Sequence, residues 1–236
     1  MPLTLGVEEA AMALQLVIGN KNYSSWSMRP WVLLRGLDIP FQELKLRFDF
    51  SENSPFRQTV ARFSPAGTVP ILVDDGFAVW DTLAIVEYLA ERFPGVWPAD
   101  AKARARARSL CAEMHSGFGA LRNHCPMNIE VSMPAIGAKV WDEQPAVRQN
   151  LARIEAMWGQ ALQASGGPFL FGAFSAVDAY YAPVAMRLRS YALPVSATTS
   201  AYVDRLAAHP AVAAFIADAL AEADFIVEDE PYRKSR

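Results

Sequence analysis

The chain has 236 residues, of which 52% are hydrophobic and 20% charged, a balance that is typical of a globular protein and excludes a disordered one. Its net charge of -3 gives no bulk electrostatic reason to bind nucleic acid or an anionic membrane, so we expect small molecules or proteins as partners. Two cysteines are too few for a disulfide framework and residues 1–13 lack a basic leader, and these two observations together predict a cytoplasmic protein. No apolar run reaches the ~18 residues of a membrane span.

Strand and helix patterns alternate along the first part of the chain. Residues 14–19 (LQLVIG) are an apolar run typical of a short buried strand, and the spacing in WVLLRGL (31–37) predicts a helix with Pro30 in its first turn. Apolar and basic residues alternate in LKLRF (44–48), which predicts a half-buried strand, and SPFRQTVARF (54–63) predicts a second helix.

The residues that follow predict a hairpin and a third helix. VPILV (69–73) and FAVW (77–80) are separated by DDG, a turn signal, and TLAIVEYLAERF (82–93) places its apolar residues on one helical face. The resulting order of strand, helix, strand, helix, hairpin and helix predicts a small α/β domain with mixed strand directions.

The proline-rich segment PGVWPAD (94–100) separates this region from a helical one. Ala, Arg, Leu, Glu and Met dominate after it, and turn signals divide the remainder into five or six predicted helices. We therefore expect an α/β domain over residues 14–94 and an all-α domain over residues 101–227. In the second domain, Ser175 stands three residues before Asp178 at the start of an apolar run, which is the pattern of a capping box.

Three serines lie where the first strand gives way to the first helix. In NKNYSSWSMRPW (20–31), the hydroxyls of Ser24, Ser25 and Ser27 would lie at a helix N-terminus, where free N–H groups and the helix dipole favour negative charge. Helix capping is the commonest role of serine at this position, so the stretch alone fits either a cap or an anion site.

Two further motifs would lie at the same end of the sheet. TVP (68–70) opens a strand. A trans Val69-Pro70 bond would simply begin an edge strand, whereas a cis bond would turn the backbone N–H and C=O of Val69 outward to pair with an extended peptide. Asp81 and Thr82 precede the third helix, where they fit a plain cap or the binding of a carboxylate.

Taken together, these motifs resemble the cytosolic glutathione S-transferases over about residues 14–227. The ordered set comprises the serine stretch, the Val-Pro pair, an acidic residue followed by Thr, the proline-rich linker and the Ser-x-x-Asp box. SSWSMR (24–29) resembles the Ser-Ser-Cys-Ser signature of zeta-class transferases and maleylacetoacetate isomerases, as in bacterial zeta-like enzymes, with Trp26 in place of the cysteine.

The resemblance implies a fold, a cofactor and a set of roles. The first domain would be thioredoxin-like (βαβαββα) and bind glutathione as co-substrate, the helical bundle would form much of the pocket for a hydrophobic electrophile, and the protein would be a homodimer without a metal. Val69 would pair its backbone with the cysteinyl part of glutathione beside a cis Pro70. Asp81 and Thr82 would hold the γ-glutamyl end, with Thr82 at its carboxylate, and Ser24 or Ser25 would face the sulfur.

A serine hydroxyl is sufficient to activate the thiol. A free thiol has a pKa of ~8.5, and the thiolate is the nucleophile. Lowering that pKa by ~2 units requires ~2.7 kcal/mol, whereas a hydrogen bond to a charged group contributes ~1.5 to 3 kcal/mol and a helix N-terminus ~0.3 to 1 kcal/mol. The serine would therefore donate a hydrogen bond to the sulfur and would not itself be the nucleophile.

Several other functions fit less well. Neither cysteine lies in the first domain, which disfavours a thiol-disulfide exchanger, and no G-x-S-x-G motif supports a serine hydrolase. Cys111 and His115 would share a helical face, but no C-x-x-C or H-E-x-x-H motif supports a metal site, and packing is the better interpretation. A non-catalytic binding or regulatory module stays open, as do glutathione-dependent isomerisation, peroxide reduction and dehalogenation.

Overall fold

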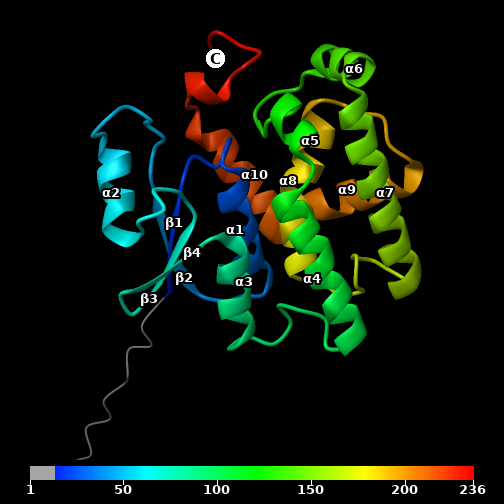
Figure 1. Cartoon of the computed structure of the whole chain (residues 1–236), viewed down its shortest axis with the longest axis horizontal. Coiled ribbons are helices and arrows are strands. Elements are labelled where there is room, and N and C mark those ends of the chain that lie inside the picture. Colours follow the sequence, from blue (N-terminus) through cyan, green and yellow to red (C-terminus); the bar gives the residue numbers. More distant parts are fainter. Residues whose placement is uncertain (1–13) are drawn as a thin grey trace, which may run out of the picture.

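The computed structural model describes residues 14–236, so the expectation about a leader in residues 1–13 lies outside it. The first part of the described chain contains four strands and three helices in the predicted order (Figure 1). They are β1 (Leu14–Ile18), α1 (Ser25–Gly36), β2 (Phe41–Lys45), α2 (Pro55–Phe63), β3 (Ile71–Asp74), β4 (Phe77–Trp80) and α3 (Thr82–Ala90).

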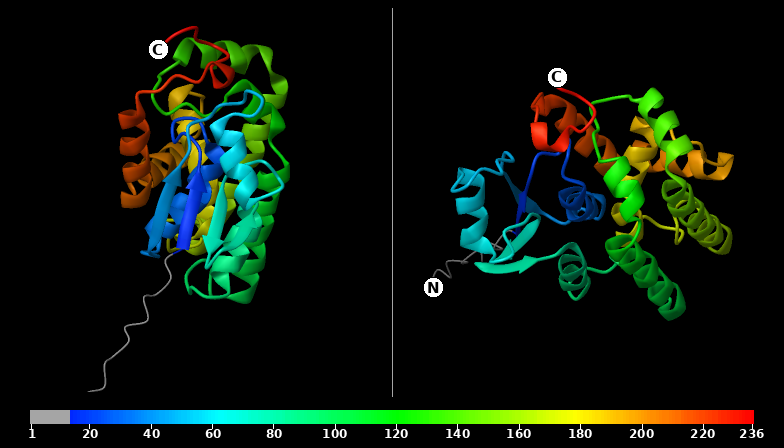
Figure 2. Two further views of the ribbon diagram at one scale, coloured as in Figure 1. Left: turned by 90° about the vertical axis from the view of Figure 1, so that its left-hand side faces the viewer. Right: turned by 45° about the horizontal axis from the view of Figure 1, so that its top comes forward.

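The four strands form one mixed sheet in the order β2-β1-β3-β4. Strand β1 pairs in parallel with β2 and antiparallel with β3, and β3 pairs antiparallel with β4. Helix α2 covers one face of the sheet, whereas α1 and α3 lie on the other face, between the sheet and the remaining helices (Figures 1 and 2). This arrangement confirms the thioredoxin-like βαβαββα domain.

Strand β2 begins earlier than the alternation of LKLRF (44–48) predicted. It spans Phe41–Lys45 because its partner β1 has only five residues, and the two strands pair from Leu14 opposite Phe41 to Ile18 opposite Lys45. The alternation itself continues past the strand, since Leu44, Leu46 and Phe48 all pack on the sheet face that α2 covers. The pattern therefore identified the buried face correctly and the strand's limits incorrectly.

Helix α1 begins at Ser25, before the apolar residues at 31–37 from which we predicted it. Ser24 is its N-cap, and the Ser24 Oγ accepts a hydrogen bond from the Ser27 N–H at 3.4 Å. Pro30 consequently lies inside the helix and not in its first turn, which corrects our expectation. Because proline has no N–H, the carbonyl of Trp26 loses its usual intrahelical donor.

The second part of the described chain is helical, as predicted, with seven α-helices in place of the expected five or six. Prolines stand at the first positions of α7 and α10, where they begin new helices directly after α6 and α9. The helices are α4 (Ala101–Ser116), α5 (Gly119–His124), α6 (Pro134–Glu143), α7 (Pro145–Ser165), α8 (Ala176–Ser190), α9 (Ala197–Ala208) and α10 (Pro210–Glu222), followed by the 3-10 turn η1 (Val227–Asp229). Within residues 14–236, no helix combines the length and apolarity needed to cross a membrane.

Helix α8 forms the centre of the helical domain and packs directly against α1. Every residue of α8 except Arg189 is buried. The predicted capping box at its start is present, with the Asp178 carboxylate accepting a hydrogen bond from the Ser175 N–H at 3.0 Å. Asp178 also accepts from the Leu170 N–H at 3.1 Å and from the Tyr202 hydroxyl at 2.8 Å. The box therefore ties α8 both to the preceding loop and to α9.

Candidate active site

Two adjoining cavities lie where the sheet domain meets the helical domain, and Trp26, Thr68 and Val69 line both of them. The larger cavity, of about 560 Å³, also contains Ser24 and Ser25. The smaller, of about 260 Å³, also contains residues from the other two motifs: Pro70, Asp81 and Thr82. The fold thus brings the three separate sequence motifs to one continuous hollow.

The hydroxyl of Ser24 is engaged within its own helix turn. Its proton is donated to the Ser27 Oγ at 2.7 Å, and its oxygen accepts from the Ser27 N–H. The Ser27 Oγ in turn accepts from the Gly19 N–H at 3.2 Å, which joins the cap to the end of β1. Ser24 therefore performs the capping role that the sequence left open.

The hydroxyl of Ser25 has a different environment. Its oxygen accepts a hydrogen bond from the Arg187 guanidinium at 3.2 Å, and no acceptor for its own proton is present among residues 14–236. Ser25 is the first residue of α1, so its side chain lies at the positive end of the helix dipole. Of the two serines, Ser25 is therefore the one whose hydroxyl proton takes part in no hydrogen bond within the described residues.

Three arginines near the serines have no carboxylate partner in the described chain. Arg187 donates to the carbonyls of Cys125 and Pro183, and Arg122 donates to the carbonyl of Met114. The guanidinium of Arg29 is stacked between the rings of Trp26 and Tyr180, at 3.9 and 4.4 Å from their centroids, with no hydrogen-bond partner in the described part.

These guanidinium groups make the site electropositive. Burial lowers the pKa of Arg187 to about 9, with Arg29 and Arg122 adding repulsion, and burial lowers the pKa of Arg29 to about 10. Both groups still carry their charge at neutral pH. A thiolate or carboxylate in the larger cavity would therefore lie near guanidinium groups whose charge is not paired with a carboxylate in the described residues, although Asp229 also lines this cavity.

The Val69-Pro70 peptide bond is cis, as the resemblance implied. Within residues 14–236, the backbone N–H and C=O of Val69 take part in no hydrogen bond. Because Val69 lines both cavities, its free donor and acceptor lie beside the hollow. An extended peptide in the hollow could pair with this residue as an added strand does.

Asp81 and Thr82 cap helix α3 at the far end of the smaller cavity. The Asp81 carboxylate accepts from the Leu83 N–H at 2.8 Å, in a backbone conformation with a φ of 72°. The same carboxylate lies 3.2 Å from the Nε2 of His115, and the buried Thr82 hydroxyl is hydrogen bonded to the Tyr180 hydroxyl. The pair is therefore held by two side chains from the helical domain.

Sequence reasoning missed the helical-domain residues that complete the site, namely Arg187, Tyr180 and His115 in this role. Tyr180 and Arg187 are seven residues apart, a spacing that places them on one face of α8 and was readable in the sequence. The sequence alone does not indicate which element packs against that face. For His115 the sequence favoured packing over a metal site, and residues 14–236 contain no group of three or more metal-ligating side chains.

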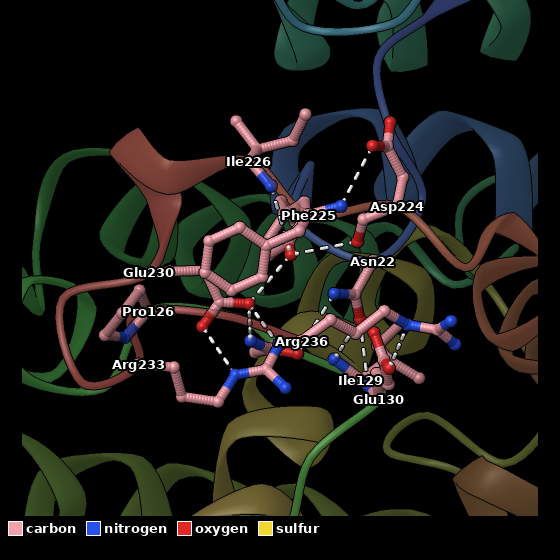
Figure 3. A network of polar contacts seen from close by, with 12 residues as sticks. Asn22, Pro126, Ile129, Glu130, Asp224, Phe225, Ile226, Glu230, Arg233 and Arg236 are labelled. Atoms are coloured by element: carbon pink, nitrogen blue, oxygen red, sulfur yellow. Dashed lines mark hydrogen bonds and ion pairs between the residues drawn. The ribbon is translucent and has the colours of Figure 1, made fainter.

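The C-terminal segment holds the loop that precedes the serines. The Tyr23 hydroxyl donates to Glu230 at 2.7 Å, and the Asn128 side chain donates to the same carboxylate at 2.8 Å. The Asn22 side-chain oxygen accepts from the N–H groups of Ile129 and Glu130, each at 2.8 Å (Figure 3). These hydrogen bonds hold the loop at Asn22 and Tyr23, directly before α1, and so fix where α1 starts.

Comparison with known families agrees with this geometry. Residues 23–92 match the family model for the glutathione S-transferase N-terminal domain, and residues 99–218 match the one for the C-terminal domain. The chain belongs to the glutathione S-transferase family.

The similar curated proteins have names that refer to different reactions. A probable maleylacetoacetate isomerase from Caenorhabditis elegans is 34% identical over 101 residues, which are 42% of this chain and 45% of the relative. A dichloromethane dehalogenase from Methylorubrum extorquens is 41% identical over 61 residues, or 25% of this chain and 20% of the relative. The chain thus matches less than half the length of these relatives.

Solved structures show the same fold along most of the chain. A glutathione transferase homolog from Burkholderia, solved with bound glutathione, superposes with a TM-score of 0.66 at 24% identity, covering 88% of this chain and 98% of that one. The Tau class glutathione S-transferase from mango superposes with a TM-score of 0.67 at 18% identity, covering 91% of this chain and 98% of that one. At these identities the likeness shows the fold alone.

Proposed function

We propose that the protein is a glutathione transferase that activates the thiol of glutathione with a serine hydroxyl for attack on a small hydrophobic electrophile. The observation that carries the proposal is the hydroxyl of Ser25, which accepts from Arg187 and keeps its own proton free at the edge of the larger cavity. Family membership and the glutathione bound in the Burkholderia structure support the choice of co-substrate.

Glutathione is proposed to lie across both cavities. The free backbone groups of Val69, beside the cis Pro70, pair with the cysteinyl part, as an added strand would. Asp81 and Thr82 hold the γ-glutamyl end in the smaller cavity, with the Thr82 hydroxyl at the carboxylate. In this orientation the thiol comes to the larger cavity, near the serines.

We propose Ser25 and not Ser24 as the donor to sulfur. Ser24 would have to give up its hydrogen bond to Ser27, whereas Ser25 has a free proton and an oxygen polarised by a guanidinium. A hydrogen bond to a charged group contributes ~1.5 to 3 kcal/mol, and the N-terminus of α1 ~0.3 to 1 kcal/mol. Together they supply the ~2.7 kcal/mol that lowers a thiol pKa by ~2 units.

The larger cavity is suited to an apolar second substrate. Its walls include Phe48, Phe56 and Met127. Isomerisation is the second candidate reaction, because one similar protein is named as a probable maleylacetoacetate isomerase. Both reactions begin with the same thiolate, so they share the serine and differ in the second substrate.

The thiolate itself provides the decisive test. Glutathione mixed with the protein at saturating concentration should show ultraviolet thiolate absorption about two pH units below the free thiol pKa of ~8.5. Absorption that follows the free thiol at every pH would contradict the proposal. That result would support the alternative of a non-catalytic glutathione-binding or regulatory protein.

We propose that the domains are residues 14–94 and 101–227, since the two family models match on either side of the proline-rich segment. The two cysteines are free and buried, which supports a reducing, cytoplasmic location.

We also propose that the protein is a homodimer that uses β4, an edge strand of the sheet. Phe77 is 63% exposed and Trp80 42%, which is unusual for large apolar side chains on one strand. A separate recess of about 470 Å³ between α4 and α7, lined by Leu110, Met157 and Phe171, offers an apolar surface for a second copy.

The Phe77→Asp variant is expected to sediment as a monomer, because a carboxylate buried at an interface is strongly unfavourable. Leu220→Asp is the control, since Leu220 is also apolar and 47% exposed but lies on α10. Sedimentation equilibrium distinguishes the species. A wild-type monomer, or a Phe77→Asp dimer of unchanged stability, would contradict the proposed surface.

A further inference from the structure

Four side chains form a continuous chain of polar contacts around the smaller cavity. The Tyr180 hydroxyl oxygen lies 2.5 Å from the Thr82 Oγ1 and 3.1 Å from the His115 Nδ1. The other ring nitrogen of His115, Nε2, lies 3.2 Å from the Asp81 carboxylate. Because Asp81 and Thr82 are adjacent, the chain closes on itself, and it joins α3 to α4 and α8.

The number of protons in this chain fixes the direction of each bond. Burial raises the pKa of Tyr180 to about 12, so its hydroxyl keeps a single proton for two partners. The Asp81 carboxylate can only accept, so the His115 Nε2 must carry a hydrogen. A neutral His115 then has a bare Nδ1 that accepts from Tyr180, and the Tyr180 oxygen must accept from Thr82. In this state the Thr82 proton is directed inward.

Protonation of His115 reverses both bonds. An imidazolium donates from both nitrogens, so Nδ1 now donates to the Tyr180 oxygen. Tyr180 must then donate its proton to the Thr82 Oγ1, and the Thr82 proton is released. The Thr82 hydroxyl thus changes from one that donates its proton to Tyr180 into one whose proton is free for a ligand beside the smaller cavity.

We propose that His115 is a positioning residue whose proton controls the affinity for the γ-glutamyl carboxylate, by turning the Thr82 hydroxyl from an inward to an outward donor. The inference rests on the proposed function, in which Thr82 binds that carboxylate. His115 acts through Tyr180 and Thr82, so the effect falls on the binding of glutathione and not on the activation of its thiol.

The charged groups that face His115 determine the pH at which it loses its proton. Burial lowers its pKa below the usual 6.5, the Asp81 carboxylate raises it, and Arg29 from α1 and Arg122 from α5 lower it. Tyr180, from α8, stays neutral. His115 is therefore mainly neutral at pH 7 in the free protein, and a bound carboxylate raises its pKa. Affinity is highest below the free-protein pKa of His115 and falls as the pH rises above it.

The test is calorimetric titration of the protein with S-methylglutathione, which retains the γ-glutamyl carboxylate and has no thiol to titrate. Between about pH 5 and pH 7, the Kd should rise about tenfold, the lower end of the effect of one hydrogen bond to a charged group. Heats measured in two buffers of different ionisation enthalpy should show that binding takes up a proton.

Three variants separate the relay from other causes. His115→Gln should bind with an affinity that does not change over this pH range. Tyr180→Phe removes the inward acceptor of the Thr82 proton, so it should bind more tightly than wild type at pH 7, whereas a merely structural role would weaken binding. Asp229→Asn is the control, because Asp229 lines the larger cavity and burial raises its pKa to about 6, and it should keep the wild-type trend.

Each outcome has one meaning. A wild-type affinity that is equal at both ends of the pH range, or a trend that persists in His115→Gln and disappears in Asp229→Asn, would overturn the inference while leaving the proposed function intact. Failure of the wild type to bind S-methylglutathione at any pH would overturn the proposed function itself.

Discussion

Replacing Ser25 by alanine is expected to raise the pKa of the bound glutathione thiol by about 1 to 2 units, because the variant loses one hydrogen bond to a charged sulfur. The hydroxyl stabilises only the thiolate, so its removal favours the protonated thiol. At neutral pH the thiolate fraction, and with it kcat for a conjugation reaction, should fall about tenfold. The loss should shrink as the pH rises above the free thiol pKa of ~8.5, where the thiol ionises without help.

The adjacent serine is the matched control for this experiment. Ser24→Ala removes the N-cap of α1 and should cost about 1 kcal/mol of stability, with a much smaller effect on the thiol. Ultraviolet absorption of the bound thiolate against pH, measured on both variants, gives the two pKa values directly. A raised thiol pKa in Ser24→Ala and an unchanged one in Ser25→Ala would assign the role to the other serine.

Replacing Asp178 by alanine should lower the free energy of unfolding by about 3 to 5 kcal/mol. The carboxylate is fully buried and accepts from the N–H groups of Ser175 and Leu170 and from the Tyr202 hydroxyl. Each of these donors would be left without a partner, at about 1 to 3 kcal/mol each. Because α8 carries Tyr180 and Arg187, glutathione binding should weaken together with stability.

Urea unfolding measures this effect, with Asp204→Ala as the control. Asp204 is an exposed carboxylate on α9, next to the helix face that carries Tyr202, and its loss should change stability by less than about 0.5 kcal/mol. Equal stabilities for the two variants would mean that the capping box does not hold α8 in place.

Much of the fold could be predicted from the sequence because local patterns decide it. The period-2 alternation at Leu44, Leu46 and Phe48 identified the buried face of the second strand, although the length of β1 decided where pairing stops. Pro30 was misplaced because a helix begins at its cap, and the hydroxyl of Ser24 determines that position more strongly than the apolar residues that follow.

The candidate site was predictable only in its first half. The serines, Val69, Asp81 and Thr82 lie at the ends of elements that the sequence identifies, so their meeting at one hollow follows from the fold. Arg187 and Tyr180 come from a helix that is buried on nearly every side, where a polar residue gives no local sign of its partner. The choice between Ser24 and Ser25 depended on that distant arginine, which explains why the sequence alone left it open.

The distance along the chain between the two halves of the site has a consequence for biosynthesis. Ser25 leaves the ribosome early, whereas Arg187, which holds its hydroxyl, follows 162 residues later, and Glu230, which fixes the loop at Tyr23, is 207 residues behind that tyrosine. A nascent chain that has emerged only as far as α7 contains all three peptide motifs and still lacks a finished site. Under the proposed function, the capacity to hold and activate a thiol therefore arrives only with α8 and the segment that follows α10.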